Sequence, residues 1–182
     1  MQVFLEGLTA THDAKFFLEE SKRLGNPIRK DIRGSPLNQG DALQAVHPVI
    51  RTNRKPNLET PLCHITQHNP FLFLTNIPEP AAVTGWKSVY VNKGFTKRIN
   101  GVTKDESDLL LAYLFNLVTQ NHDAQVRFKW RKNDLAIWDN RSMFHCATYD
   151  YADARAGDRV CSLGEAPYLD LASKGRREAL AL

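Results

Sequence analysis

Alternating apolar and polar residues predict several short strands, most of them in the second half of the chain. The clearest case is Gln125–Trp130, where every second side chain is apolar. Asn133-Asp134 then gives a turn signal, and Leu135–Trp138 follows as a second strand, which together indicate a hairpin. In all, we expect strands at residues 45–52, 86–91, 125–130, 135–138, 144–149 and 159–163.

Two segments carry helical signals. Residues 13–24 begin with Asp13 as a cap and are followed by Gly25 as a stop. Thr103 and Glu106 have the spacing of a capping box, in which each side chain bonds to the backbone N–H of the other residue. The helix that they start should run to about Thr119, with one apolar stripe made by Leu110, Leu111, Leu114, Leu117 and Val118.

These elements predict one domain that is mainly β with flanking helices. The predicted strands of the second half lie close together along the chain, which is typical of an antiparallel barrel or a double-sheet jelly roll with helices outside. A chain of 182 residues is long enough to bury a real core. The fold we expect is a partial double-stranded β-helix, cupin-like in architecture.

The segment from Arg54 to about Ala82 differs from the rest of the chain. It holds five of the nine prolines and none of the ten glycines. Its apolar centre, Phe71–Leu74, follows neither a helical nor a strand period. Because long irregular loops are uncommon in compact domains, we treat residues 54–82 as an atypical insertion and expect them to pack poorly.

Composition narrows the class of partner. Lys and Arg outnumber Asp and Glu by only 24 to 20, and the cations are scattered. This mild excess suits a small anionic substrate and argues against a nucleic-acid partner. The three cysteines form no CxxC pair, which fits a reducing compartment. No apolar run spans a membrane and no signal peptide opens the chain, so we expect a cytoplasmic protein with no membrane partner, compatible with a homo-oligomer.

The stretch from Asn133 to Pro167 carries the candidate chemistry. A predicted strand ends in Trp138-Asp139-Asn140-Arg141, His145 follows, and Arg155 and Arg159 come ten and fourteen residues later. This block resembles the C-terminal motif of the taurine dioxygenase (TauD/TfdA) family of Fe(II)/2-oxoglutarate-dependent dioxygenases, in its fungal sulfonate/taurine type. Four further segments look like family segments in family order: residues 4–12, 47–52, 91–99 and 125–130.

The resemblance implies a role for each matching position. His145 would be the second histidine of the iron site, whose two His and one carboxylate leave positions open for the co-substrate and O2. Arg155 would pair with the distal carboxylate of 2-oxoglutarate, since a guanidinium offers two parallel hydrogen bonds. Arg159 would hold the substrate anion, and Phe95 would line the substrate pocket. One insertion or deletion in the alignment would instead give the 2-oxoglutarate role to Arg159. Asp139 and Arg141 are expected to act as scaffold.

The cofactors implied are Fe(II), 2-oxoglutarate and O2, with ascorbate as a supporting reductant. The intact family member would hydroxylate the carbon beside a sulfonate and release sulfite and an aldehyde, while 2-oxoglutarate becomes succinate. Another small organic anion, such as an aryloxyacetate, or a purine is the alternative substrate. A non-catalytic truncated product or binding fragment is the alternative function.

The departure from the family lies in the iron motif. The family's first His and its carboxylate occur as H-x-D/E, and none of the six histidines here begins such a triplet: His12, His47, His64, His68, His122 and His145. We therefore expect the chain to be an incomplete domain, the C-terminal part of the family fold, and to be inactive by itself. One imidazole does not hold Fe(II) tightly, and no carboxylate is placed by the motif to replace the missing pair.

Residues 54–82 also interrupt a family reading, H-P-V-x-R-T-[N/H]-P-V-T-G, which resumes at Val83-Thr84-Gly85. Arg54-Lys55 can be encoded by CGTAAG, which contains a splice donor, and Ala81-Ala82 by GCAGCC, which contains an acceptor. Removing the sequence between them would restore the missing proline. A translated intron is the favoured interpretation, and a genuine surface insertion, which loop-closure entropy tolerates well, is the alternative.

Overall fold

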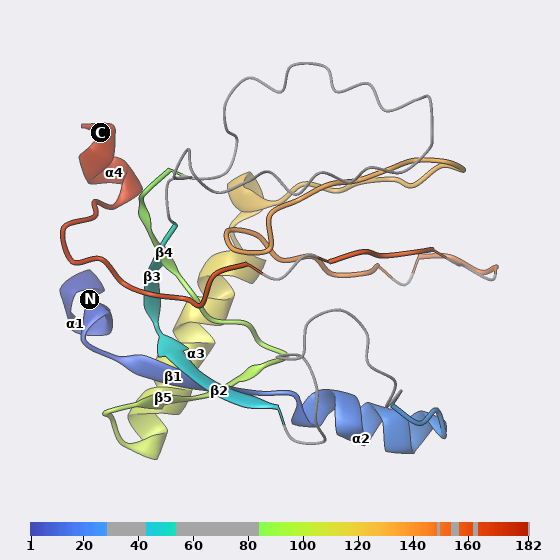
Figure 1. Cartoon of the computed structure of the whole chain (residues 1–182), viewed down its shortest axis with the longest axis horizontal. Coiled ribbons are helices and arrows are strands. Elements are labelled where there is room, and N and C mark those ends of the chain that lie inside the picture. Colours follow the sequence, from blue (N-terminus) through green and yellow to red (C-terminus); the bar gives the residue numbers. More distant parts are fainter. Residues whose placement is uncertain (29–42, 54–83, 149, 154–156, 162–163, 182) are drawn as a thin grey trace.

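The centre of the molecule is a three-stranded antiparallel sheet. The computed structural model describes residues 1–28, 43–53, 84–148, 150–153, 157–161 and 164–181. Strand β1 (Thr9–Asp13) lies between β2 (Gln44–Pro48) and β5 (Thr96–Asn100), in the order β2-β1-β5 (Figure 1). Ala10 pairs with His47 on one side and Ile99 on the other, and Ala10 and Ile99 are fully buried.

A second sheet continues from the first. The expected strand at 45–52 forms as β2 and β3 (Ile50–Thr52), which are separated at Val49. Strand β3 pairs antiparallel with β4 (Lys87–Val89), which lies within the expected strand at 86–91. Val49 is fully buried at the junction, so the chain passes from one sheet to the next through the core.

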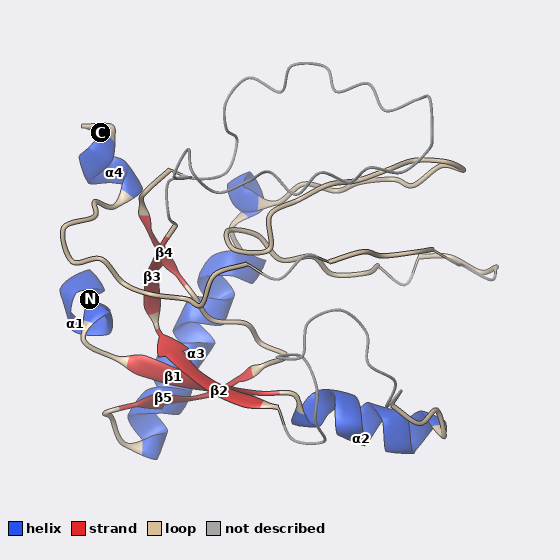
Figure 2. Ribbon diagram, viewed as in Figure 1, coloured by secondary structure: helices blue, strands red, loops and turns tan. Residues whose placement is uncertain are grey.

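The two predicted helices form, and the described residues contain three further short ones. Helix α2 (Lys15–Leu24) ends at Gly25, whose φ of 66° is the left-handed conformation that glycine adopts without strain. Helix α3 (Lys104–Thr119) begins with the predicted capping box of Thr103 and Glu106. The other helices are α1 (Gln2–Glu6), the 3-10 turn η2 (His122–Ala124) and α4 (Arg176–Ala179) (Figure 2).

Helix α3 packs against β5 to make the core. The buried apolar side chains of the described residues are Leu5, Ala10, Val49, Ile50, Ile99, Leu111 and Leu114. The Ser107 hydroxyl accepts a hydrogen bond from the backbone N–H of Ile99 at 2.9 Å, which fixes the helix to the strand. The predicted apolar stripe is correct for Leu111 and Leu114 but wrong for Leu117, which is 48% exposed because α3 runs on past the sheet (Figure 1).

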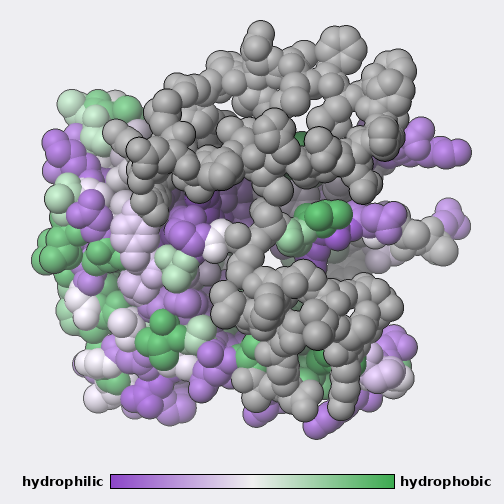
Figure 3. All heavy atoms as spheres, in the orientation of Figure 1, coloured by the Kyte–Doolittle hydropathy of each residue, from purple (hydrophilic) through white to green (hydrophobic). Residues whose placement is uncertain are grey.

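Residues 125–148 contain no helix or strand in the part of the chain that is described. The strands predicted at 125–130 and 135–138 are therefore wrong as hydrogen-bonded elements, and the described residues of 144–149 and 159–163 form none either. The alternation is present, yet both of its faces meet solvent: Val126 is 93% exposed and Ile137 86%. Figure 3 shows hydrophobic and hydrophilic groups side by side on the segments that project at the right of the view.

The C-terminal segment returns to the second sheet. The N–H of Thr52 donates to the carbonyl of Tyr168 at 2.8 Å, and the N–H of Lys87 donates to the carbonyl of Lys174 at 2.9 Å. Within the described residues, no helix is both long and apolar enough to cross a membrane.

The coarse fold prediction is confirmed, since antiparallel sheets are flanked by helices. The closed jelly roll stays a prediction. Residues 54–82 lie outside the described residues, so the expectation that they pack poorly is also untested.

Candidate functional site

His145 lies in the exposed segment that follows the Trp138–Arg141 turn. Its imidazole packs against the indole of Trp138, with ring centroids 4.8 Å apart and planes inclined by 58°. Trp138 is itself held locally, because its Nε1–H donates to Asn140 Oδ1 at 2.8 Å. Asn140 therefore holds Trp138, and Trp138 packs against His145, which remains exposed to solvent.

The two candidate arginines are not brought to His145 by the described contacts. Arg155 lies outside the described residues. Arg159 is exposed and, in the part of the chain that the structure covers, makes no hydrogen bond or ion pair. Which arginine binds 2-oxoglutarate is therefore still a prediction from the motif.

Phe95 sits in the turn that leads into β5. Asn92 builds this turn: its Oδ1 accepts from the N–H of Gly94 at 2.8 Å, and its N–H donates to Thr96 Oγ1 at 2.8 Å. The ring of Phe95 lies 5.5 Å from that of Phe17 on α2 and is 36% exposed. Phe95 thus has the partial exposure that a pocket-lining residue needs, and its ring contact is with α2.

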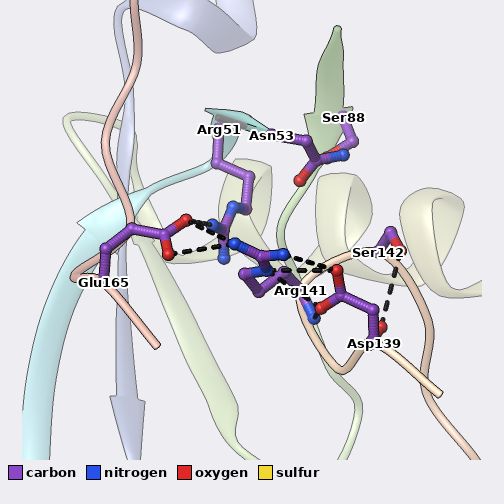
Figure 4. A network of polar contacts seen from close by, with 7 residues as sticks. All are labelled: Arg51, Asn53, Ser88, Asp139, Arg141, Ser142 and Glu165. Atoms are coloured by element: carbon purple, nitrogen blue, oxygen red, sulfur yellow. Dashed lines mark hydrogen bonds and ion pairs between the residues drawn. The ribbon is translucent and has the colours of Figure 1, made fainter. Parts of the chain in front are cut away.

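A charge network that the sequence did not reveal joins the Trp138–Arg141 turn to the core (Figure 4). Arg51 on β3 is only 2% exposed, and its Nη2 lies 3.1 Å from Glu165 Oε1. Glu165 also pairs with Arg141, Oε2 to Nη1 at 3.1 Å, and Arg141 pairs with Asp139, Nη2 to Oδ2 at 2.9 Å. We call these four residues the Arg51 network, and Asp139 and Arg141 take in it the scaffold role expected of them.

The electrostatics of the network favour its charged form. Burial opposes ionisation of Asp139, but hydrogen bonds from the Arg141 side chain and backbone, together with the charges of Arg141 and Arg51, outweigh it and lower the pKa of Asp139. The pKa of Glu165 is also lowered. Burial raises this pKa, but a backbone hydrogen bond and the two arginines lower it by more. Both carboxylates are therefore ionised at neutral pH.

A cluster of aromatic and imidazole rings lies beside Arg51. The Arg51 guanidinium stands 5.1 Å from the ring centroid of Tyr90, a cation–π geometry. The rings of His12 and His47 lie 5.5 and 5.9 Å from that of Tyr90 and 5.4 Å from each other. His12 Nδ1 is 3.1 Å from Thr96 Oγ1, whereas its buried Nε2 has no partner.

Both imidazoles in this cluster are held neutral. Burial, reinforced by the charge of His47, lowers the pKa of His12 to about 4. Burial and the charge of Arg51 lower the pKa of His47. A neutral imidazole is the form that binds metals, but the adjacent Arg51 cation opposes a metal ion at this place.

The donors that the structure describes do not form an Fe(II) site by themselves. Among the described residues, no group of three His, Cys, Asp or Glu side chains is placed to hold a metal ion. Two surface hollows, of about 400 and 350 Å³, are lined by residues of α3 and its end and by residues 127–134, and neither includes His145 or Arg159.

Comparison with known proteins defines the family. The model of the taurine catabolism dioxygenase TauD, TfdA family matches residues 1–161. The chain therefore belongs to the TauD/TfdA dioxygenase family, as the Trp138–Arg141 and His145 motif predicted.

Relatives of known name extend this result. The alpha-ketoglutarate-dependent dioxygenase btcD of Neocamarosporium betae is 44% identical over 98% of this chain and 44% of its own length. The alpha-ketoglutarate-dependent dioxygenase esdpJ of Penicillium shearii is 40% identical over 97% of this chain and 40% of its own length. The alpha-ketoglutarate-dependent sulfonate dioxygenase of Saccharomyces cerevisiae is 30% identical over 94% of this chain and 33% of its own length. The chain thus spans less than half the length of these relatives.

Arg51 and Glu165 are the residues that sequence reasoning missed. A charged residue inside an apolar strand was a usable signal for Arg51, because buried charges need partners. Nothing local marks Glu165, which is 114 positions from Arg51 and lies beyond the residues matched by the family model.

Proposed function

We propose that this chain supplies the C-terminal part of the active site of an Fe(II)/2-oxoglutarate-dependent dioxygenase that acts on a sulfonate such as taurine. The observation that carries the proposal is the Trp138–Arg141, His145 and Arg155/Arg159 block, which lies within the residues matched by the family model. The relatives that share this region are named as alpha-ketoglutarate-dependent dioxygenases, and the yeast one as a sulfonate dioxygenase.

The proposed roles follow from side-chain chemistry. His145 would give one imidazole ligand to iron, and its solvent exposure leaves its ring free to do so. Arg155 would bind the distal carboxylate of 2-oxoglutarate through its planar fork, and Arg159 would bind the sulfonate. Phe95 would cover an apolar part of the substrate. Fe(II), 2-oxoglutarate and O2 would be the co-reactants, and the matched region would form part of a jelly roll.

The 182 residues alone should not catalyse this reaction. Three protein groups hold iron in such sites, and the motif supplies one of them here. A non-catalytic product of the gene is the second candidate function, and the missing H-x-D/E triplet is the observation that favours it.

A direct assay tests the proposal for this chain. Purified 1–182, given Fe(II), ascorbate and 2-oxoglutarate, should form no succinate above the metal-only background, with or without taurine. Robust succinate formation that His145→Ala abolishes would contradict the one-ligand account. Asp150 and Asp153 would then be the first carboxylates to replace.

We also propose that residues 54–82 interrupt a β-hairpin. The ends of the segment are close together: the N–H of Gly85 donates to the carbonyl of Asn53 at 2.7 Å, and the N–H of Asn53 donates to the carbonyl of Trp86 at 3.0 Å. Gly85 has a φ of 71°. The family reading would leave Pro-Val83-Thr84 between Asn53 and Gly85, which gives a loop of four residues when the left-handed Gly85 is included. Four-residue loops are among the common hairpin connections.

A further inference from the structure

The Arg51 network closes the base of the segment that carries every downstream candidate residue. Arg141 precedes His145, and Glu165 follows Arg159, so the ion pair between Arg141 and Glu165 joins the two ends of residues 142–164. We call this ion pair the bracket. The two partners are 24 positions apart. In Figure 4 both side chains converge on Arg51, which comes from β3 in the core.

Each end of this bracket is fixed by additional bonds. Asp139 accepts from both the backbone N–H and the Nε–H of Arg141, at 2.9 and 3.0 Å, and its carbonyl accepts from the N–H of Ser142 and Met143. After Glu165, the Thr52 N–H bonds to Tyr168, and the N–H of Asp170 donates to Thr52 Oγ1 at 2.9 Å. The Glu165 end is therefore tied directly to β3, and the Arg141 end is linked to β3 through Glu165.

Glu165 is the central member of the network. It is the carboxylate that bonds both guanidinium groups, while Asp139 bonds only Arg141. Arg51 Nε is buried without a partner. Neutralising Glu165 would leave a buried arginine without its counterion and directed toward a second arginine, so the bracket should open.

We infer that Arg51 and Glu165 are positioning residues that hold the two ends of segment 142–164 together, so that His145 and Arg159 are presented from one fixed base. The roles of His145 and Arg159 rest on the proposed dioxygenase function. The geometry that Arg51 and Glu165 impose can be measured without iron, 2-oxoglutarate or turnover. Three of the four network residues, Asp139, Arg141 and Glu165, belong to no helix or strand. Opening the bracket should therefore leave the sheet and α3 in place.

Two native cysteines allow the bracket to be measured. Cys146 and Cys161 are free and exposed, and they lie just inside Arg141 and Glu165 in the sequence. With Cys63 replaced by serine, spin labels on Cys146 and Cys161 would report the separation of the two arms by pulsed electron resonance. The parent chain should give one narrow distance distribution.

Glu165→Gln should broaden this distribution at least twofold, while far-UV circular dichroism of the sheet and helices stays unchanged. Arg51→Met should do the same and Arg51→Lys less, since lysine keeps the charge but not the fork. Glu178→Gln removes an exposed carboxylate outside the network and should have no effect. Should Glu165→Gln fail to fold, Arg141→Met removes the same contact from its more exposed side.

An unchanged distribution in folded Glu165→Gln or Arg141→Met would overturn the inference. Because the labels report geometry alone, this outcome is independent of whether any dioxygenase activity is found. The bracket could open as expected while the chain, completed with the remaining iron ligands, shows no turnover. That result would reject the proposed function and keep the positioning role.

Discussion

At the scale of single residues, the polar interior is organised around Arg51. Its guanidinium faces Glu165 on one side and the ring of Tyr90 on the other, and Tyr90 contacts both His12 and His47. The sequence correctly assigned Asp139 and Arg141 to the scaffold, because they are neighbours in one motif. It did not reveal the Arg51–Glu165 pair, because a contact between residues 114 positions apart leaves no periodic or local trace.

The half-buried imidazole of His12 should make stability depend on pH. Its pKa in the folded chain is about 4, below the ordinary value of 6.5. Above pH 6.5 both states are neutral and the stability is fully present. As the pH falls from 6.5 toward 4, the unfolded chain takes up the proton first, so stability is lost in this window.

Urea unfolding at pH 7.5 and pH 5 measures this effect. We expect a loss of about 1–2 kcal/mol, less than the full pKa shift implies because the ring is partly exposed to solvent. His12→Gln should reduce the loss, while His122→Gln, at an exposed histidine in η2, should retain it. Equal losses in all three proteins would show that His12 is not the group responsible.

At the scale of elements, local signals predicted the helices and not all of the strands. Helix α3 was predictable because its capping box is complete within four residues. Strands β1 and β5 were missed because Thr9–Asp13 and Thr96–Asn100 lack apolar alternation and form through pairing with each other. The reverse error occurred at 125–138, where alternation is strong and no described strand lies alongside to complete a ladder.

The hairpin of β3 and β4 should close without its insertion. Replacing residues 54–82 by a single proline would shorten the connection between Asn53 and Gly85 from 31 residues to three. Loop-closure entropy then favours the folded state by about 2 kcal/mol. Thermal or urea unfolding should show a gain of this order.

A second variant separates loop length from loop geometry. Gly85→Val in the shortened chain should remove the gain, because a β-branched residue is strained at a φ of 71°. A shortened chain that is less stable than the parent would contradict the hairpin proposal. Sequencing the transcript decides independently whether residues 54–82 are encoded by an intron.

At the scale of the whole molecule, the family is established and the site remains a prediction. The chain belongs to the TauD/TfdA family, and the block from Trp138 to Arg159 is where its motif predicts part of the site. The remaining ligands could not be predicted from these residues, because none carries the H-x-D/E pattern. The predicted convergence of His145 with the two arginines would also depend on long-range packing that local patterns do not encode.

The central claim is that His145 becomes an iron ligand when the rest of the site is present. The most direct measurement is succinate formation by a chimera in which this chain, with 54–82 replaced by proline, takes the place of the matched region of btcD. We predict 2-oxoglutarate turnover in the chimera, its loss by at least a hundredfold in His145→Ala, and no change in the control His122→Ala. A folded chimera whose turnover is equal with and without His145 would contradict the account.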